Sequence, residues 1–395
     1  MPTVELYDFS PLLRLLITGL ALALGPLAWV WLRNKNASTT QRLRVLTLLT
    51  LFLTFDLVLF GAFTRLTDSG LGCPDWPGCY GSASPLGAKQ HINAAQDAMP
   101  SGPVTHPKAW IEMIHRYLAT GVGVLILTLT VGTWLARRRR AADMVQAPSV
   151  WWPVVTLVWV CAQGAFGALT VTMKLFPAIV TSHLLGGLVL LTLLRAQATR
   201  YPRPLLLSTA LPNAALPRAV WWWVVGSFAA LWLQIALGGW VSTNYAVLVC
   251  SDFPTCQGML WPAMDFREGF TFWRSLGMTA EGGNISFQAL TAIHYVHRLT
   301  AYVVFALVVA VSIKLYAFAA FRRSALWLGG LMLLQVATGM SNVVLGWPLI
   351  GAVAHTGGAA ALVIVLTGII FSGLPTNQGV RFGRPAKPAF SRLAT

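Results

Sequence analysis

Four histidines occupy regular places in a chain that is poor in polar residues, and imidazole is the commonest side-chain ligand of metal ions. His115 and His297 each begin a His-Arg pair. His183 and His355 each stand twenty residues after a glutamine. Two imidazoles on facing helices can hold a haem iron from both sides, each through a neutral nitrogen. The spacing therefore predicts two haem sites, each with two histidines.

A single histidine inside a membrane segment more often makes a hydrogen bond between helices. Here four recur at matched positions, and ionisable side chains in a membrane are costly enough to indicate function. Zinc fits less well, because no further cluster of ligands accompanies the histidines.

The two segments with His-Arg pairs differ three residues before the pair, where Glu112 stands in the first and His294 in the second. Residues three apart share a helix face, so Glu112 is expected to point into the same cavity as His115. A carboxylate there suits proton transfer or stabilisation of a developing cation. The alternative is an ion pair with a nearby arginine. His294 competes with His297 as a ligand, but the aligned His-Arg pairs favour His297 and leave His294 to hydrogen-bond a neighbour.

Two short cysteine loops repeat each other. Cys73 and Cys79 recur 177 positions later as Cys250 and Cys256, with five residues between the members of each pair. In an oxidising compartment each pair is expected to form a disulfide, although four cysteines allow three pairings.

The composition is that of a membrane protein. The 395 residues are 56% hydrophobic and 10% charged, whereas a soluble domain carries about 25% charged residues. Runs long enough to cross a hydrocarbon core predict nine helical spans. Their expected limits are 11–33, 44–64, 110–135, 151–173, 178–196, 219–243, 289–314, 325–346 and 350–373.

The formal net charge of +16 raises the question of nucleic acid, but the basic residues gather in alternate loops, with Arg137 to Arg140 as the densest run. The positive-inside rule places these loops and the C-terminus in the cytoplasm, and the N-terminus and both cysteine loops outside. We therefore expect a multi-pass protein of the inner (plasma) membrane that binds no nucleic acid. The first span lacks a preceding basic region, so we expect it to be retained.

Without the first span, eight remain, four per half, and an even number gives both halves the same orientation. The expected fold is an all-α polytopic membrane protein. It has two parallel four-helix repeats in an eight-helix pseudo-twofold bundle, plus one extra N-terminal transmembrane helix. The expected segments are 1–40 for that helix and its loop, 41–204 and 205–374 for the two halves, and 375–395 for a cytoplasmic tail.

Four other charged residues lie near or inside the spans. Arg65, Arg116 and Arg298 lie near the outer surface, where guanidinium groups can pair with haem propionates. Lipid headgroups are the alternative. Asp56 lies within the second span and needs a polar partner, for a structural hydrogen bond or a proton path.

Several motifs resemble the haem A synthases of bacterial and mitochondrial terminal-oxidase pathways, over about residues 44–373. They are TRLTDSGLGCPDWPGCYG (64–81), EMIHR (112–116), TSHLLGG (181–187), HRLTAY (297–302) and VLGWPLIGAVAHTGG (344–358). The resemblance implies an eight-helix bundle that oxidises the C8 methyl group of haem O to a formyl group. It also implies that His297 and His355 bind haem b, that His115 and His183 lie where haem O binds, and that Glu112 takes part in catalysis. The span at 11–33 departs from the eight-helix plan.

The expected function is therefore that of a haem A synthase-type oxidoreductase, with haem O as substrate, haem b as cofactor and lipid around it. Haem O synthase and cytochrome oxidase assembly factors are candidate partners, and the electron donor is unknown. The alternatives are a diheme cytochrome b-like electron carrier and a haem transporter. A carboxylate in only one half favours the enzyme, because a pure carrier has no need of it.

Overall fold

The computed structural model describes residues 10–139, 149–202 and 215–375, and their regular structure is helical. Within these ranges, nine helices are long and apolar enough to cross a membrane. They are α1 (Ser10–Arg33), α2 (Thr39–Leu66), α4 (His106–Arg138), α5 (Trp151–Thr172), α6 (Pro177–Thr199), α8 (Arg218–Thr243), α10 (Phe287–Tyr316), α11 (Arg322–Val344) and α12 (Leu349–Ser372). The prediction of an all-helical multi-pass membrane protein is confirmed. Arg140, the boundary at 204/205 and residues 376–395 of the predicted tail lie outside the described residues.

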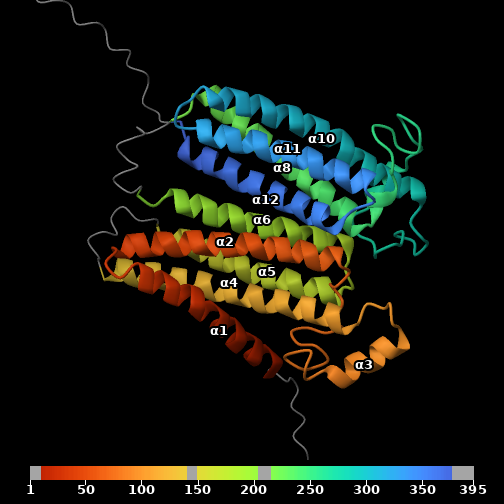
Figure 1. The fold of residues 1–395 in the computed structure, drawn as a ribbon, viewed down its shortest axis with the longest axis horizontal. Helices are drawn as coiled ribbons and strands as arrows, with labels where there is room; N and C mark the ends of the chain where they lie inside the picture. The colour runs from red at the N-terminus through yellow and green to blue at the C-terminus, as the bar shows by residue number, and fades with distance from the viewer. Residues whose placement is uncertain (1–9, 140–148, 203–214, 376–395) are drawn as a thin grey trace, which may run out of the picture.

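Eight of these helices form two rings of four by their contacts. In Figure 1 the helices of the second ring lie above those of the first. In the first ring α2 packs against α4, α4 against α5, α5 against α6, and α6 against α2. In the second ring the same order holds for α8, α10, α11 and α12. Because the helices are apolar on most faces, each can present one side to its neighbours and another to lipid.

The rings meet through α2 and α6 of the first and α8 and α12 of the second. At the ends of α2 and α8, Arg65 donates to the carbonyl of Ser242 at 2.6 Å, and Tyr245 donates to Asp68 at 2.7 Å. The guanidinium of Arg65 also lies 4.1 Å from the ring centre of Tyr245. Both hydrogen bonds join residues 177 positions apart, which is the offset of the repeat in this region. Contacts between equivalent positions are those expected at a twofold axis.

The extra helix α1 belongs to the first ring alone, since it packs against α4 and, less extensively, α2. Gly19 lies so close to Thr120 of α4 that a Cβ at Gly19 would overlap that side chain. Nearer the N-terminal end of α1, Leu15 is buried with Cys73, Cys79 and Met113. The N-terminal end of α1 therefore supports the first cysteine loop.

Two long connections leave the same end of the bundle (Figure 1). The first, between α2 and α4, contains α3 (Lys89–Ala98), and the second, between α8 and α10, contains η2 (Ala246–Leu248) and α9 (Phe266–Gly269). Each contains one of the cysteine loops, Cys73–Cys79 in the first and Cys250–Cys256 in the second. Both loops thus lie over the ends of α4 and α10 that carry the His-Arg pairs.

Candidate functional site

The four predicted histidines lie on helices that face each other across the rings. His115 is on α4 and His183 on α6, across the first ring; His297 is on α10 and His355 on α12, across the second. In each ring these two helices are separated by the other two, so they flank its centre. The histidines of each pair lie within electrostatic range of one another. The structure therefore brings together the two pairs that the spacing predicted.

Each imidazole lies against a glycine of the transmembrane helix that precedes its own. The pairs are His115 with Gly61, His183 with Gly167, His297 with Gly238, and His355 with Gly339. A Cβ at Gly238 would lie 2.9 Å from Cε1 of His297, and one at Gly61 would lie 3.0 Å from Nε2 of His115. Glycine at these places leaves room for the imidazoles between the helices. Sequence reasoning missed these residues, although Gly61 and Gly238 stand at equivalent positions of the repeat.

In the second ring both histidines have polar partners. Thr338 Oγ1 lies 3.0 Å from Nδ1 of His355. Nε2 of Gln234 lies 3.1 Å from Nδ1 of His297, and Thr300 donates to the amide oxygen of Gln234. These partners hold the rings of His297 and His355 in fixed orientations.

In the first ring the histidines lack such partners among the described residues. Nδ1 of His183 is buried and makes no hydrogen bond. The ring of His115 stacks on Phe60, with 6.3 Å between ring centres, and no hydrogen bond to that imidazole is found in the described part of the chain.

Glu112 is buried beneath the first cysteine loop, which the disulfide between Cys73 and Cys79 closes. Only 4% of the surface of Glu112 is exposed. Its carboxylate forms an ion pair with Arg116 and accepts a hydrogen bond from the backbone N–H of Cys73 at 2.8 Å. This is the ion-pair alternative for Glu112. The carboxylate is tied to the loop, one helical turn from His115.

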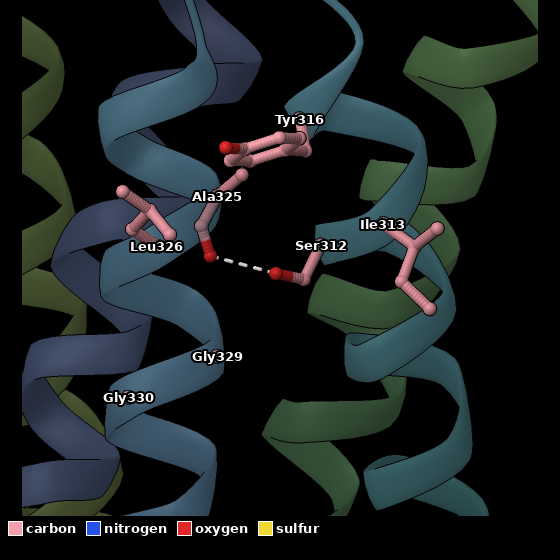
Figure 2. Close-up of a pocket in the computed structure, with 7 residues that line it drawn as sticks. All are labelled: Ser312, Ile313, Tyr316, Ala325, Leu326, Gly329 and Gly330. Carbon is pink, nitrogen blue, oxygen red and sulfur yellow. Dashed lines mark hydrogen bonds between the residues drawn. The ribbon is translucent and has the colours of Figure 1, made fainter.

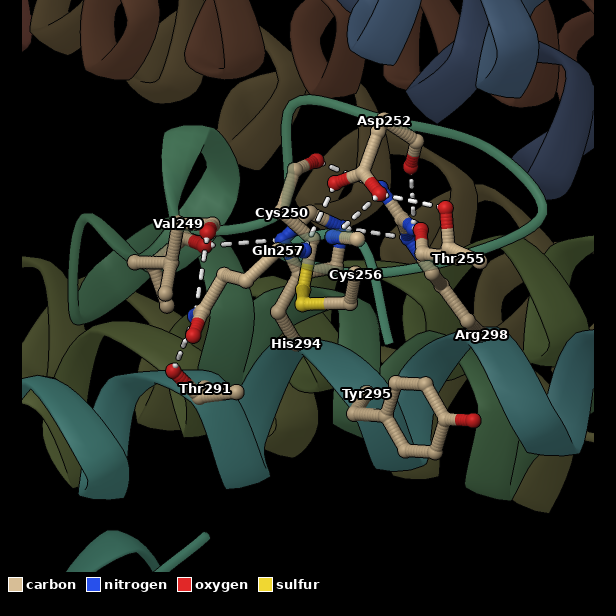
Figure 3. The surroundings of a disulfide bond; sticks show 12 residues. Val249, Cys250, Asp252, Thr255, Cys256, Gln257, Thr291, His294, Tyr295 and Arg298 are labelled. Atoms are coloured by element: carbon tan, nitrogen blue, oxygen red, sulfur yellow. Dashed lines mark hydrogen bonds between the residues drawn. A yellow bond between two sulfur atoms is a disulfide. The ribbon is translucent and has the colours of Figure 1, made fainter. Parts of the chain in front are cut away.

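His294 takes the equivalent place in the second ring (Figure 3). Its Nδ1 lies 2.9 Å from the carbonyl of Ala246, and its Nε2 accepts from Nε of Arg298 at 3.2 Å. The expected hydrogen bond from His294 to a neighbour is thus present. An acid–arginine pair in one ring corresponds to a histidine–arginine pair in the other.

The two arginines that follow the histidines bind loop carbonyls. Arg116 donates to the carbonyls of Asp75, Pro77 and Gly78 at 3.0, 3.2 and 2.5 Å. Arg298 donates to those of Cys250, Asp252 and Thr255 at 2.5, 2.8 and 3.0 Å (Figure 3). These bonds engage donors of both arginines, and the contact of Arg116 and Arg298 with haem propionates stays a prediction. Arg65, the third candidate, bonds across the junction of the rings instead. The repeat places an arginine after each cysteine loop, but it does not show which groups of the loop that arginine binds.

The two cysteine loops have the same local structure. Cys73 is bonded to Cys79 and Cys250 to Cys256, so each disulfide closes its own loop. In the first disulfide loop (Cys73–Cys79), Asp75 accepts from the N–H groups of Tyr80 and Gly81 just after it. Such a turn needs a positive φ at Gly81, which glycine supplies without strain.

The second disulfide loop (Cys250–Cys256) repeats this turn with one addition. Asp252 accepts from the N–H groups of Gln257 and Gly258, at 2.7 and 3.0 Å, and also from the hydroxyl of Thr255 at 2.5 Å. The bond from Thr255, with the backbone N–H groups, lowers the pKa of Asp252 to about 2. The aspartate is therefore ionised at neutral pH.

Asp56 behaves differently from the prediction. It is exposed on α2, and its carboxylate makes no hydrogen bond or ion pair with any described residue. The equivalent position of the repeat is Leu233, which is 57% exposed on α8. The polar partner expected for Asp56 is therefore not found within the described chain.

A shallow pocket between α10 and α11 lies away from the histidines (Figure 2). It is mostly apolar, and its polar lining side chains are Ser312, which donates to the carbonyl of Ala325, and Tyr316. Ser312 is about 22 Å along α10 from His297 at 1.5 Å per residue. The pocket is thus separate from the histidine pairs.

The fold and the site define a multi-pass helical membrane protein built from two four-helix rings, each with one pair of half-buried histidines across it. The chain belongs to the COX15-CtaA family, described as cytochrome oxidase assembly protein, whose model matches residues 44–367. The match leaves out α1.

Curated relatives are named heme A synthase. The chain is 39% identical over 323 residues to the heme A synthase of Shewanella oneidensis. This alignment covers 81% of this chain and 93% of the relative. It is 27% identical to that of Rhizobium etli, over 82% of this chain and 88% of the relative. It is 25% identical to that of Halalkalibacterium halodurans, over 75% and 85% of the two chains.

Proposed function

We propose that this protein is a haem A synthase, a membrane oxidoreductase that converts the C8 methyl group of haem O to a formyl group for terminal oxidases. The observation that carries the proposal is the pair of half-buried histidines across each ring, in a chain of the COX15-CtaA family. Two imidazoles per ring are the donors that would hold one haem iron through two histidines. The glycines beside the imidazoles keep that space free of side chains.

We assign haem b to the second ring, where His297 and His355 would hold its iron, and substrate haem O to the first, with His115 and His183. The imidazoles of His297 and His355 are fixed by polar partners, which suits a resident group. Nδ1 of His183 has no partner among the described residues, which suits a substrate that must leave. Haem b, when bound, supplies a redox centre. The residues of the chain bind and orient the two haems and keep water from them.

Glu112 is our candidate for the proton-handling acid of the first ring. It lies one turn from His115, and the second ring has His294 in its place. Its partners Arg116 and the N–H of Cys73 fix the carboxylate in position. Small movements of the first disulfide loop would therefore change where the acid lies. Arg65 remains a candidate for a propionate contact only if its bonds at the junction open.

We place the protein in the inner membrane with the disulfide loops and N-terminus outside and the C-terminus in the cytoplasm. Basic residues at the opposite ends of the helices support this orientation, among them Arg33, Arg137 and Arg218. We also propose that the chain divides into residues 1–40, 41–204, 205–374 and 375–395. Haem O synthase and oxidase assembly factors are the proposed protein partners.

Extraction of haem from membranes that express the protein together with a source of haem O tests the function. We expect haem A to accumulate only with the intact chain. A diheme electron carrier or a haem transporter would leave haem O unchanged, so either rival would be recognised by haem O alone in the extract.

A further inference from the structure

The histidines of the two rings differ in the side chains that contact their second nitrogen. We propose that Gln234, Thr300 and Thr338 make the second ring a retained haem site, by fixing the orientation of the His297 and His355 imidazoles and the proton position of His355. Apolar residues at the matching positions leave the first ring able to exchange its haem. The inference rests on the proposed function, because it takes haem b as resident and haem O as substrate.

The contact of Thr338 with His355 has a defined direction. The hydroxyl of Thr338 donates to the carbonyl of Leu334, one turn earlier on α11, at 2.7 Å. Its oxygen is therefore free to accept from Nδ1–H of His355, 3.0 Å away. A proton held on Nδ1 leaves the lone pair on Nε2 for iron. A hydrogen bond to Nδ1–H also makes the imidazole a stronger ligand.

The contact of Gln234 with His297 is held by a third residue. Thr300 lies one turn after His297 on α10 and donates to the amide oxygen of Gln234. Nε2 of Gln234 also donates to the carbonyl of His297 at 3.1 Å. The amide is thus fixed between two groups of α10, 3.1 Å from Nδ1 of His297. This contact orients the imidazole of His297.

In the first ring the three positions that match these polar residues carry apolar side chains. Gln234 corresponds to Leu57, Thr300 to Leu118, and Thr338 to Phe166. None of these side chains can hydrogen-bond an imidazole, and Nδ1 of His183 is buried without a partner. By contrast, the glutamine twenty residues before each α6 or α12 histidine is present in both rings. The two halves thus share these glutamines but differ at the positions of Gln234, Thr300 and Thr338.

A ligand without its second hydrogen bond binds metal more weakly, by about 10- to 100-fold in typical sites. A site that must release its product gains from weaker ligation. A resident redox centre gains from stronger ligation. The two sets of matching positions fit these opposite needs.

The test uses the full-length protein with His183→Ala, so that only the second ring holds haem by two histidines. Thr338→Val removes the hydroxyl at nearly constant shape, and Gln234→Leu introduces the residue of the first ring. Thr338→Ser keeps the hydroxyl and is the matched control. The measurements are the rate of haem loss to excess apomyoglobin and the low-spin electron paramagnetic resonance spectrum of the oxidised haem.

We expect haem loss to be about 10- to 100-fold faster in Thr338→Val and Gln234→Leu, with shifted g values, and nearly unchanged in Thr338→Ser. Rates within twofold of the parent, with unchanged g values in both variants, would overturn the proposal. If Thr338→Val does not fold, Gln234→Leu and Thr300→Val decide the same question. A parent that holds no haem in the second ring would instead refute the proposed function, so the two failures are distinguishable.

The converse variant restores a partner in the first ring. Phe166→Thr, in a chain with His355→Ala, places a hydroxyl where the second ring has Thr338. We expect slower loss of haem from the first ring than with Phe166→Val, the control of similar size. Equal rates for the threonine and valine variants would contradict a role for this position in haem retention.

Discussion

The two rings carry the same ligands but surround them differently. In the second ring Gln234 and Thr338 contact the imidazoles, and a neutral histidine lies beneath the disulfide loop. In the first ring the matching positions are apolar, and an acid lies beneath the loop. Two similar sites in a duplicated bundle can therefore differ in function through the residues that contact the ligand histidines or lie one helical turn from them.

The largest effect should come from removing ligands. His297→Ala or His355→Ala should abolish the low-spin spectrum of bound haem b, because one imidazole cannot hold the iron from both sides. His115→Ala or His183→Ala should leave that spectrum and reduce haem A formation at least 100-fold. Optical spectra of purified protein and haem extraction measure the two outcomes. Loss of the haem b spectrum in His115→Ala, with its retention in His297→Ala, would mean that the roles of the rings are reversed.

The next largest effect should come from the acid. Glu112→Gln keeps the shape and the hydrogen bond from Cys73 but removes the charge. Loss of a general acid or base lowers turnover by about 100- to 10,000-fold, so haem O should accumulate while haem b stays bound. His294→Gln is the matched change in the second ring and should lower turnover much less. Undiminished haem A production by Glu112→Gln would exclude the acid from catalysis.

The membrane spans could be predicted from sequence, because uncharged runs of sufficient length have few alternatives in a protein of this composition. The histidine pairs could be predicted because the repeat fixes their place on equivalent helices. The partners of Arg116 and Arg298 could not, since backbone carbonyls leave no mark in the sequence. Gln234 and Thr338 were visible in principle as polar residues opposite apolar ones in the repeat. Their contact with the imidazoles depends on helix rotation, which hydrophobic patterns specify poorly when a helix is apolar on most faces.

A smaller effect should follow loss of a disulfide, and it should differ between the loops. Replacing Cys73 and Cys79 by serine frees the segment whose N–H holds Glu112, so turnover should fall along with stability. The same change at Cys250 and Cys256 should lower stability alone. The chain-entropy model gives about 2 kcal/mol for a loop of this size.

Haem A formation and thermal unfolding, measured for both double variants, separate the two effects. Equal losses of turnover in the two variants would show that the first loop acts on the site no more than the second.

The smallest predicted effect lies in the second disulfide loop, where Thr255 donates to Asp252. Its match in the first loop is Gly78, where a Cβ would lie 2.5 Å from the carbonyl oxygen of Ser82. Threonine is therefore compatible with the second loop only.

Because the pKa of Asp252 is lowered to about 2 from an ordinary value of 3.8, its ionised form stabilises the loop at neutral pH. This contribution is fully present well above the ordinary pKa and is lost as the pH falls through about 2. Thr255→Ala should raise the pKa of Asp252 part of the way back, since the N–H groups of Gln257 and Gly258 remain. Titration of the Asp252 carboxyl carbon by NMR measures the shift, with Thr255→Ser as the control that keeps the hydroxyl. An unchanged midpoint in Thr255→Ala would mean that the backbone N–H groups alone set the pKa, and that the two loops hold their aspartates in the same way.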